Sequence, residues 1–170
     1  MQTECCGNCT TENRRTDVVI AGFGSSHGDD QAGWQVIALL RRRADLPARL
    51  VEIRESTQLL DELDERRRLI VIDACVGGHQ LGAITRIGWP DPRIRQYHNH
   101  STHGVGLCNA LELAERLGRM PADVEVFGIE VGTCRPLDGI SAEVSQAATD
   151  LADIIAAELY ETVDARTVIG

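Results

Sequence analysis

Lysine is absent from this sequence of 170 residues, and all 17 basic residues are arginines. Phosphate loops of the Walker type and Schiff-base enzymes both need a lysine amine, so neither class fits. No apolar run approaches the ~20 residues of a membrane helix. The beginning of the chain also lacks the apolar centre of a signal peptide. We therefore expect a cytoplasmic protein that has no membrane partner.

Positive charge is scarce as well, because 26 acidic residues outnumber the arginines and give a net charge of -9. Nucleic acids and anionic membranes both require a basic face on the protein, so we expect neither as a partner. The content of 43% hydrophobic and 25% charged residues is typical of a globular domain with a full core.

The chain divides into a short arm, one domain and a tail. Residues 1–16 are polar and show no periodicity, which predicts a flexible arm. Residues 17–160 form one α/β domain without an internal repeat, and residues 161–170 are expected to be a frayed tail.

Six cysteines fall into two groups. The three in the arm include two thiols three positions apart that can share a metal, but no second pair is spaced for a closed zinc site. Metal binding and incidental thiols both stay open for the arm. The other three lie in or beside apolar segments and are expected to be reduced core residues. The two groups are Cys5, Cys6 and Cys9, and Cys75, Cys108 and Cys134.

Apolar runs typical of strands alternate along the chain with segments of helical periodicity. Strands are predicted from Val18 onward and over 50–53, 69–75, 82–89 and 124–130, and helices over 34–41, 59–68, 105–117 and 141–159. The run 69–75 is the most hydrophobic and is expected at the centre of the sheet, and 82–89 is expected near an edge. This alternation predicts a three-layer, doubly wound α/β fold with a mostly parallel sheet of about five strands.

The loop after the first strand carries two adjacent acids, Asp29 and Asp30. Gly22-Phe23-Gly24 resembles the start of a dinucleotide-binding loop, but His27 occupies the place of its third glycine, and two acids repel a pyrophosphate. Helix capping explains one acid better than two. The remaining interpretation is that one carboxylate points into the crevice at the carboxyl edge of the sheet, to hold a metal or to transfer protons.

Two further residues are expected at this edge, Asp73 and His103. Asp73 ends the most hydrophobic strand, where a carboxylate is costly to bury unless it is paired, hydrogen-bonded or metal-bound; a turn aspartate is the alternative. Ser101 or Thr102 can cap the helix whose apolar face begins at Val105, which places His103 in the first turn of that helix. Together with Asp30, these residues suit a divalent metal such as nickel or zinc. No serine or cysteine has an obvious nucleophile signature, so hydrolysis would rely on a metal or an activated water.

The order of these motifs resembles the hydrogenase maturation endopeptidases from about Asp17 to Tyr160. The resemblance rests on Gly22-Phe23-Gly24, Gly28-Asp29-Asp30, Ile72-Asp73-Ala74, Ser101-Thr102-His103 with Gly106-Leu107, Gly128-Ile129-Glu130, and Pro136-Leu137-Asp138-Gly139-Ile140-Ser141 with Val144.

The resemblance implies a cytoplasmic endopeptidase that removes the C-terminal extension from the large-subunit precursor of a nickel-iron ([NiFe]) hydrogenase. It also implies that Asp30, Asp73 and His103 contact nickel supplied by the precursor, so that nickel insertion is checked before the cut. A non-catalytic metal-binding or maturation chaperone that uses the same pocket is the alternative.

This chain departs from the family pattern around the acid pair. Ser25 replaces the usual asparagine, Gln31 replaces a glycine, and the loop between them is about one residue shorter and contains His27. These departures leave open which precursor is recognised and whether His27 adds a ligand.

Overall fold

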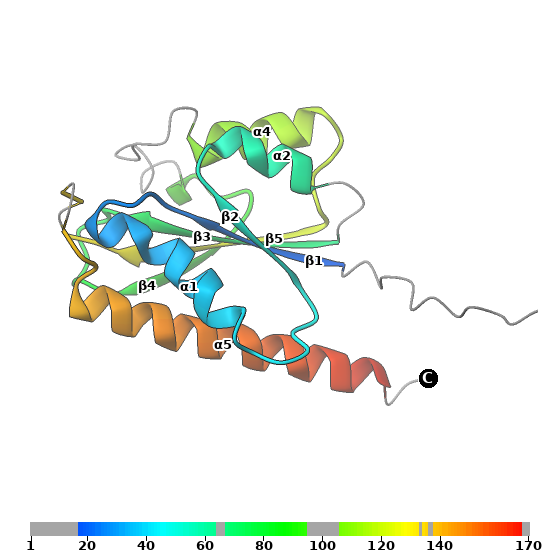
Figure 1. The fold of residues 1–170 in the computed structure, drawn as a ribbon. Coiled ribbons are helices and arrows are strands. Elements are labelled where there is room, and N and C mark those ends of the chain that lie inside the picture. Colours follow the sequence, from blue (N-terminus) through cyan, green and yellow to red (C-terminus); the bar gives the residue numbers. More distant parts are fainter. Residues whose placement is uncertain (1–16, 64–66, 95–105, 133, 136–137, 168–170) are drawn as a thin grey trace, which may run out of the picture.

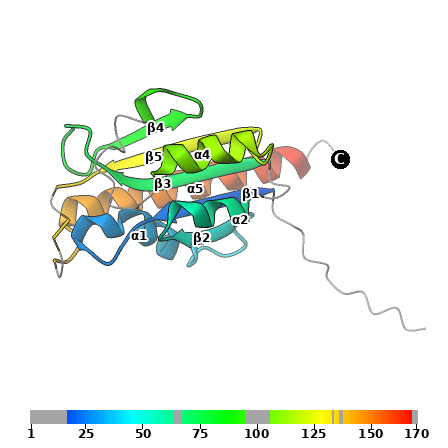
Figure 2. The same ribbon diagram turned by 90° about the horizontal axis from the view of Figure 1, so that it is seen from above.

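The computed structural model describes residues 17–63, 67–94, 106–132, 134–135 and 138–167. Their strands form one sheet in the order β2-β1-β3-β5-β4 (Figure 2). Four strands are parallel, and β4 runs antiparallel to β5 at the edge. The strands are β1 (Val18–Phe23), β2 (Arg49–Ile53), β3 (Arg68–Cys75), β4 (Ile84–Gly88) and β5 (Asp123–Glu130). The predicted fold class, the central strand and the edge strand are confirmed.

Helices cover both faces of the sheet. In Figure 1, α2 and α4 lie above the sheet and α1 and α5 lie below it, which gives three layers. The helices are α1 (Ala32–Leu40), α2 (Leu59–Glu62), α4 (Leu107–Arg116) and α5 (Ala142–Thr167), with short 3-10 helices η1 (Gly28–Gln31) and η2 (Ser56–Gln58).

Each central strand buries side chains on both faces. Ile20 and Ile70 belong to the core beneath α1 and α5, whereas Val19 and Leu69 belong to the core beneath α2 and α4. A strand that is covered on both faces has no polar side, which is why β1 and β3 are continuous hydrophobic runs in the sequence.

Helix α2 is shorter than predicted, because it ends at Glu62 instead of near Arg68. Arg68 already belongs to β3, and its backbone N–H donates to the carbonyl of Asp17 at 3.1 Å. The pairing of β3 with β1 thus begins where the sequence predicted the end of a helix.

Helix α5 is longer than predicted and continues to Thr167, although we expected fraying from Glu161. The hydroxyl of Tyr160 donates to the carbonyl of Ala44 at 2.7 Å, which fixes this part of the helix against the loop after α1. The predicted arm 1–16 lies outside the described residues.

Two glycines let α1 approach the sheet closely. A Cβ added at Gly33 would lie 2.7 Å from the carbonyl oxygen of Ile72 and closer still to that of Phe23, and one at Gly22 would overlap the backbone of Gly33. Real Cβ atoms do not come this near to backbone atoms, so glycine is required at this contact. The start of α1 is thereby held against the carboxyl ends of β1 and β3.

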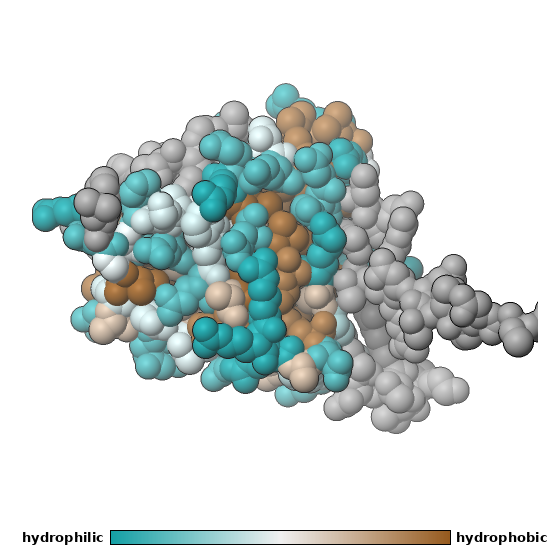
Figure 3. Space-filling view, viewed as in Figure 1, coloured by the Kyte–Doolittle hydropathy of each residue, from teal (hydrophilic) through white to brown (hydrophobic). Residues whose placement is uncertain are grey.

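The surface is mainly polar on the face seen in Figure 3, where hydrophobic side chains form a narrow band between hydrophilic ones. No helix within the described ranges is both long enough and apolar enough to cross a membrane.

Candidate active site

The turn between β1 and α1 buries both acids that the sequence singled out. Asp29 is 5% exposed and Asp30 is 7% exposed, and both lie in η1. Gly28 begins η1 with a φ of +54°, a conformation that glycine adopts without strain. The backbone N–H of Asp30 donates to the carbonyl of His27 at 3.1 Å, and the carbonyl of Asp30 accepts from the N–H of Ser25 at 3.3 Å. These bonds fix the backbone on which Asp30 stands.

The carboxylate of Asp29 links this turn to the loop that follows β5. Its Oδ1 accepts from the backbone N–H of Ser141 at 2.6 Å, and its Oδ2 accepts from that of Gly132 at 3.4 Å. The N–H of Gly28 donates to the carbonyl of Asp138 at 3.1 Å in the same region. Asp29 therefore joins two loops at the carboxyl edge of the sheet. Its partners lie in the loop between β5 and α5, so it does not cap the helix that directly follows it in the chain.

Asp73 lies inside β3, two residues before the end of the strand, and not in the following turn. It is 2% exposed, and its Oδ1 accepts from the N–H of Ala74 at 2.8 Å. β3 is the neighbour of β1 in the sheet, and η1 contacts β3. The structure thus brings Asp30 and Asp73 to the same edge of the sheet, at the left in Figure 1. His103 lies outside the described residues.

Glu130 is a buried carboxylate whose role the sequence did not reveal. It ends β5 with an exposed fraction of 4%, and it accepts the backbone N–H groups of Gly77 at 2.9 Å and of Gly78 at 2.8 Å. These bonds hold the turn that follows β3, next to Asp73. The sequence pattern that could have revealed Glu130 is the one that singled out Asp73: an acid late in a hydrophobic strand, where a buried carboxylate needs a partner.

The described cysteines have different environments. Cys75 and Cys108 are buried, as predicted, but Cys134 is exposed, and its prediction as a core residue was wrong. Burial raises the pKa of the Cys75 thiol to about 12, with help from the nearby charges of Glu130 and Asp73. Partial burial raises the pKa of Cys134 too, and the charges of Asp30 and Asp29 add to the effect. Cys134 was mispredicted because its loop is held at the carboxyl edge by Asp29, beyond the apolar strand.

Polar and aromatic side chains surround the acid-bearing turn. The indole N–H of Trp34 donates to the carbonyl of Ile53 at 3.1 Å, and the guanidinium carbon of Arg54 lies 4.6 Å from the centre of the Trp34 ring. His27 is exposed, and its Nδ1 lies 2.9 Å from the hydroxyl oxygen of Ser25. Within the described residues, His27 thus supplies an imidazole and Arg54 a guanidinium around the turn that carries Asp29 and Asp30.

The described part of the chain contains no group of three or more histidine, cysteine or acidic side chains arranged to hold a metal ion. Of the three residues predicted to contact a metal, the structure describes Asp30 and Asp73, and His103 lies outside the described residues. A metal contact by all three residues is therefore carried forward as a proposal.

Comparison with known proteins identifies the family. Residues 36–158, well over half of the chain, match the family described as HycI: Hydrogenase maturation protease. The chain belongs to this family. No curated protein sequence matches it significantly.

Solved structures of hydrogenase maturation proteases share the fold. The hydrogenase maturating endopeptidase HybD from E. coli has a TM-score of 0.72 at 21% identity, over 85% of this chain and 93% of that chain. The [NiFe] hydrogenase maturation protease HycI from Thermococcus kodakarensis KOD1 has a TM-score of 0.67 at 23% identity, over 85% and 93%. A hydrogenase 2 maturation peptidase from Thaumarchaeota archaeon SCGC_AB-539-E09 has a TM-score of 0.63 at 25% identity, over 84% and 97%.

Membership of the hydrogenase maturation protease family confirms the predicted activity at the level of the reaction. The chain is a peptide-bond hydrolase, an endopeptidase of hydrogenase maturation that processes a large-subunit precursor. The alternative of a non-catalytic chaperone is not favoured.

Proposed function

We propose that this protease removes the C-terminal extension of a [NiFe] hydrogenase large-subunit precursor after nickel insertion, and that it does so in the cytoplasm. The observation that carries the proposal is the burial of two acids at the carboxyl ends of neighbouring strands in a hydrogenase maturation protease fold: Asp30 in the turn that follows β1, and Asp73 in β3. The other two buried acids at this edge accept backbone N–H groups of nearby loops, Asp29 from Gly132 and Ser141 and Glu130 from Gly77 and Gly78. We assign Asp30 and Asp73 to the precursor because they occupy the positions that the family resemblance implies for contacts with nickel.

The charge of this edge supports a cationic substrate group. Buried carboxylates at one edge of the sheet favour a divalent cation, because its charge compensates theirs. Carboxylate and imidazole ligands suit nickel, and we propose that His103 supplies the imidazole. In this scheme the nickel belongs to the precursor and is part of the substrate, so Asp30, Asp73 and His103 contact it without holding it permanently.

Hydrolysis adds one water across the scissile peptide bond. The carbon–nitrogen bond breaks, the carbonyl carbon gains the hydroxyl oxygen and becomes the new C-terminal carboxylate, and the nitrogen leaves as the amine of the released peptide. Cys75 does not serve as the nucleophile, because a buried thiol with a pKa of about 12 stays protonated at neutral pH. We propose that Asp30, Asp73 and His103 bind the precursor's nickel. This contact positions the scissile bond for hydrolysis, so a precursor without nickel is not positioned for the cut.

Intact mass spectrometry of the precursor tests this proposal. The nickel-loaded precursor and the same precursor without nickel are each incubated with the protein. Loss of a short C-terminal peptide from the loaded precursor alone is expected. Cleavage of both precursors at equal rates would contradict the nickel check. An unchanged mass in both, despite measurable binding, would contradict the cleavage and leave the chaperone.

A further inference from the structure

Arg54 lies on an aromatic ring at the carboxyl edge of the sheet. It directly follows Ile53, the last residue of β2, and its guanidinium carbon lies 4.6 Å from the centre of the Trp34 ring. The Oε1 atom of Gln58 accepts the backbone N–H of Arg54 at 2.9 Å, which fixes the main chain at this residue. Arg54 is exposed, and no acid among the described residues forms an ion pair with it. Its guanidinium is therefore accessible and has no carboxylate bound to it in this part of the chain.

A continuous set of contacts ties Arg54 to the turn that carries Asp30. The indole N–H of Trp34 donates to the carbonyl of Ile53 at 3.1 Å, so the ring is fixed at the end of β2. Gly24 leaves room for the ring, because a Cβ added there would lie 3.2 Å from Cγ of Trp34 and 2.7 Å from the carbonyl oxygen of Asp30. The Trp34 ring and the backbone of Asp30 thus meet at Gly24. Arg54 packs against the same ring and belongs to the same unit of structure.

We propose that Arg54 binds a carboxylate of the precursor, on the segment around the cut. The carboxylate belongs to an acidic side chain or to the C-terminus of the precursor, and Trp34 positions the guanidinium that receives it. The choice of the precursor as the partner rests on the proposed function, and the preference of Arg54 for a peptide carboxylate does not.

A guanidinium that is stacked on a ring is suited to a carboxylate. Stacking occupies one face of the group, whereas its N–H donors lie in the plane and stay available. Two parallel N–H donors match the two oxygens of a carboxylate, and such charge-assisted pairs are among the stronger hydrogen bonds in proteins. The Trp34 ring also restricts the arginine side chain before the ligand arrives, which lowers the entropy cost of binding.

The order of charges along the edge selects the ligand. The sheet order β2-β1-β3 places Arg54 at the end of β2, Asp30 in the turn after β1, and Asp73 late in β3. A ligand with several negative charges, such as a polyphosphate, is repelled by these acids. The nickel-loaded precursor of the proposed function brings a cation for the acids and, on the same chain, a carboxylate for the arginine.

The spacing of the strands sets where the carboxylate lies on the precursor. Two strand spacings, about 10 Å, separate β2 from β3, and an extended peptide covers this distance with about three residues. We therefore expect the carboxylate about three positions from the precursor residue that is held at Asp73. A contact at this distance from the reacting bond strengthens the binding of the precursor and of the transition state equally, so it lowers KM without changing kcat.

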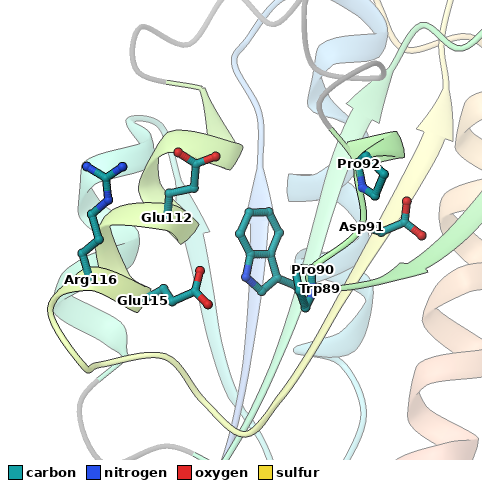
Figure 4. Close-up of a pocket in the computed structure, with 7 residues that line it drawn as sticks. All are labelled: Trp89, Pro90, Asp91, Pro92, Glu112, Glu115 and Arg116. Carbon is teal, nitrogen blue, oxygen red and sulfur yellow. The ribbon is translucent and has the colours of Figure 1, made fainter.

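The hollow between β4 and α4 supplies a matched control. This cavity of about 680 Å³ is lined by Trp89, Glu115 and Arg116, among others (Figure 4). The backbone N–H of Trp89 donates to the carbonyl of Val124, near the beginning of β5, so the cavity lies away from the carboxyl edge of the parallel strands. Arg116 is exposed like Arg54. Removing its charge makes the same change at a different hollow of the surface.

Steady-state cleavage of the nickel-loaded precursor tests the contact. Arg54→Gln is expected to raise KM about tenfold and to leave kcat within about twofold, because it removes one charge-assisted contact. Arg54→Lys keeps the charge but not the planar fork, and is expected to raise KM less than Arg54→Gln does. Arg116→Gln is expected to change neither constant. An unchanged KM in Arg54→Gln, or an equal rise in Arg116→Gln, would overturn the proposal.

Peptide binding tests Arg54 without any cleavage and identifies the source of the carboxylate. The chain has two tryptophans, so Trp89→Phe leaves Trp34 as the single fluorophore. The probes are acetylated penta-alanine with a C-terminal amide, the same amide with glutamate as its middle residue, and acetylated penta-alanine with a free C-terminus. A saturable change in Trp34 fluorescence is expected with at least one of the two carboxylate peptides and not with the plain amide. Arg54→Gln is expected to abolish it.

The outcomes separate the carboxylate site from the proposed cleavage. A response to the glutamate peptide alone identifies an acidic side chain as the ligand, and a response to the free C-terminus alone identifies the terminal carboxylate. Equal responses to all the peptides, no response to either carboxylate, or a response that survives Arg54→Gln would overturn the site. A response that depends on Arg54 in a protein that cuts no precursor would support the site and contradict only the cleavage.

Discussion

Asp29 and Asp30 are adjacent in the chain, but their carboxylates have different surroundings. Asp29 accepts hydrogen bonds from backbone groups more than 100 positions away, at Gly132 and Ser141. It therefore stabilises the loop arrangement around the site. Asp30 is the acid that we propose to meet the precursor's nickel. Each acid of the pair can then be tested by a different measurement, stability for Asp29 and cleavage for Asp30.

Asp29→Ala is expected to lower the free energy of unfolding by about 2 kcal/mol, because it removes a buried charged acceptor from two partly buried backbone N–H groups. Asn at this position keeps one acceptor oxygen and is expected to cost less. Urea denaturation measures both variants. Asp138 lies in the same loop with an exposed side chain, and Gly28 bonds only its backbone carbonyl, so Asp138→Ala is the control. Equal stability of Asp29→Ala and the wild type would contradict the linking role.

The thiols predict a selective alkylation pattern. At pH 8, a thiol with the pKa of about 12 found for Cys75 is only about one ten-thousandth thiolate, and it is also buried. Cys134 is exposed and is expected to react first with iodoacetamide in the folded protein. Mass spectrometry counts the adducts in a variant whose arm cysteines are replaced by serine. A native protein in which Cys75 reacts as fast as Cys134 would contradict the assignment. The replaced cysteines are Cys5, Cys6 and Cys9.

At the scale of elements, the sequence predicted the strands well and the loop contacts poorly. Strand β3 was recognisable because both of its faces are buried, and Asp73 stood out as an acid within that hydrophobic run. The partners of Asp29 were not predictable, because hydrogen bonds to backbone N–H groups leave no pattern in the side-chain sequence. The exposure of Cys134 follows from the same contacts, so it was missed for the same reason.

Helix boundaries were also less predictable than strands. The sequence placed the end of α2 near Arg68, but β3 takes that residue by pairing with β1. Helix α5 extends past Glu161 to Thr167, and Tyr160 anchors it to Ala44 through a contact that local periodicity does not encode.

Because α1 packs so closely against β1, adding one methyl group at Gly33 is predicted to lower the stability of the fold. Gly33→Ala is expected to lower the free energy of unfolding by about 3 kcal/mol, because the added Cβ overlaps the backbone of Phe23 and Ile72. This loss outweighs the gain of about 1 kcal/mol that alanine brings to an unstrained helix position. Chemical denaturation measures it. Gly88→Ala is the control, because a Cβ there meets no atom within 4 Å. A Gly33→Ala protein as stable as this control would contradict the packing.

At the scale of the whole molecule, an ion-pair network joins the sheet to α5. Arg68 pairs with Glu125 at 2.5 Å, and Arg86 pairs with Glu125 at 2.7 Å and with Glu158 at 2.6 Å. These residues connect β3, β5, β4 and α5 at the edge opposite the buried acids. The guanidinium of Arg86 also lies 5.1 Å from the centre of the Phe127 ring.

This network predicts how stability changes with pH. Burial acts to raise the pKa of Glu125, but the hydrogen bonds from Arg68 and Arg86 outweigh it and leave the pKa below the usual value. A carboxylate whose pKa is lower in the folded state stabilises the fold above its unfolded pKa of about 4.3 and loses this contribution as the pH falls through the folded value. Glu125→Gln is expected to reduce stability by about 1 kcal/mol at pH 7 and to flatten the acid part of the stability curve. An identical pH dependence in both proteins would contradict the role of Glu125.

The central claim is that Asp30 and Asp73 act on the precursor and are not needed for folding. The most direct measurement is the rate at which Asp73→Ala and Asp30→Ala release the C-terminal peptide from the nickel-loaded precursor, beside the thermal unfolding of each variant. We expect the rate to fall at least about 100-fold, a loss of about 2.7 kcal/mol in transition-state stabilisation, with little change in unfolding. A rate within about threefold of the wild type in folded variants would contradict the account.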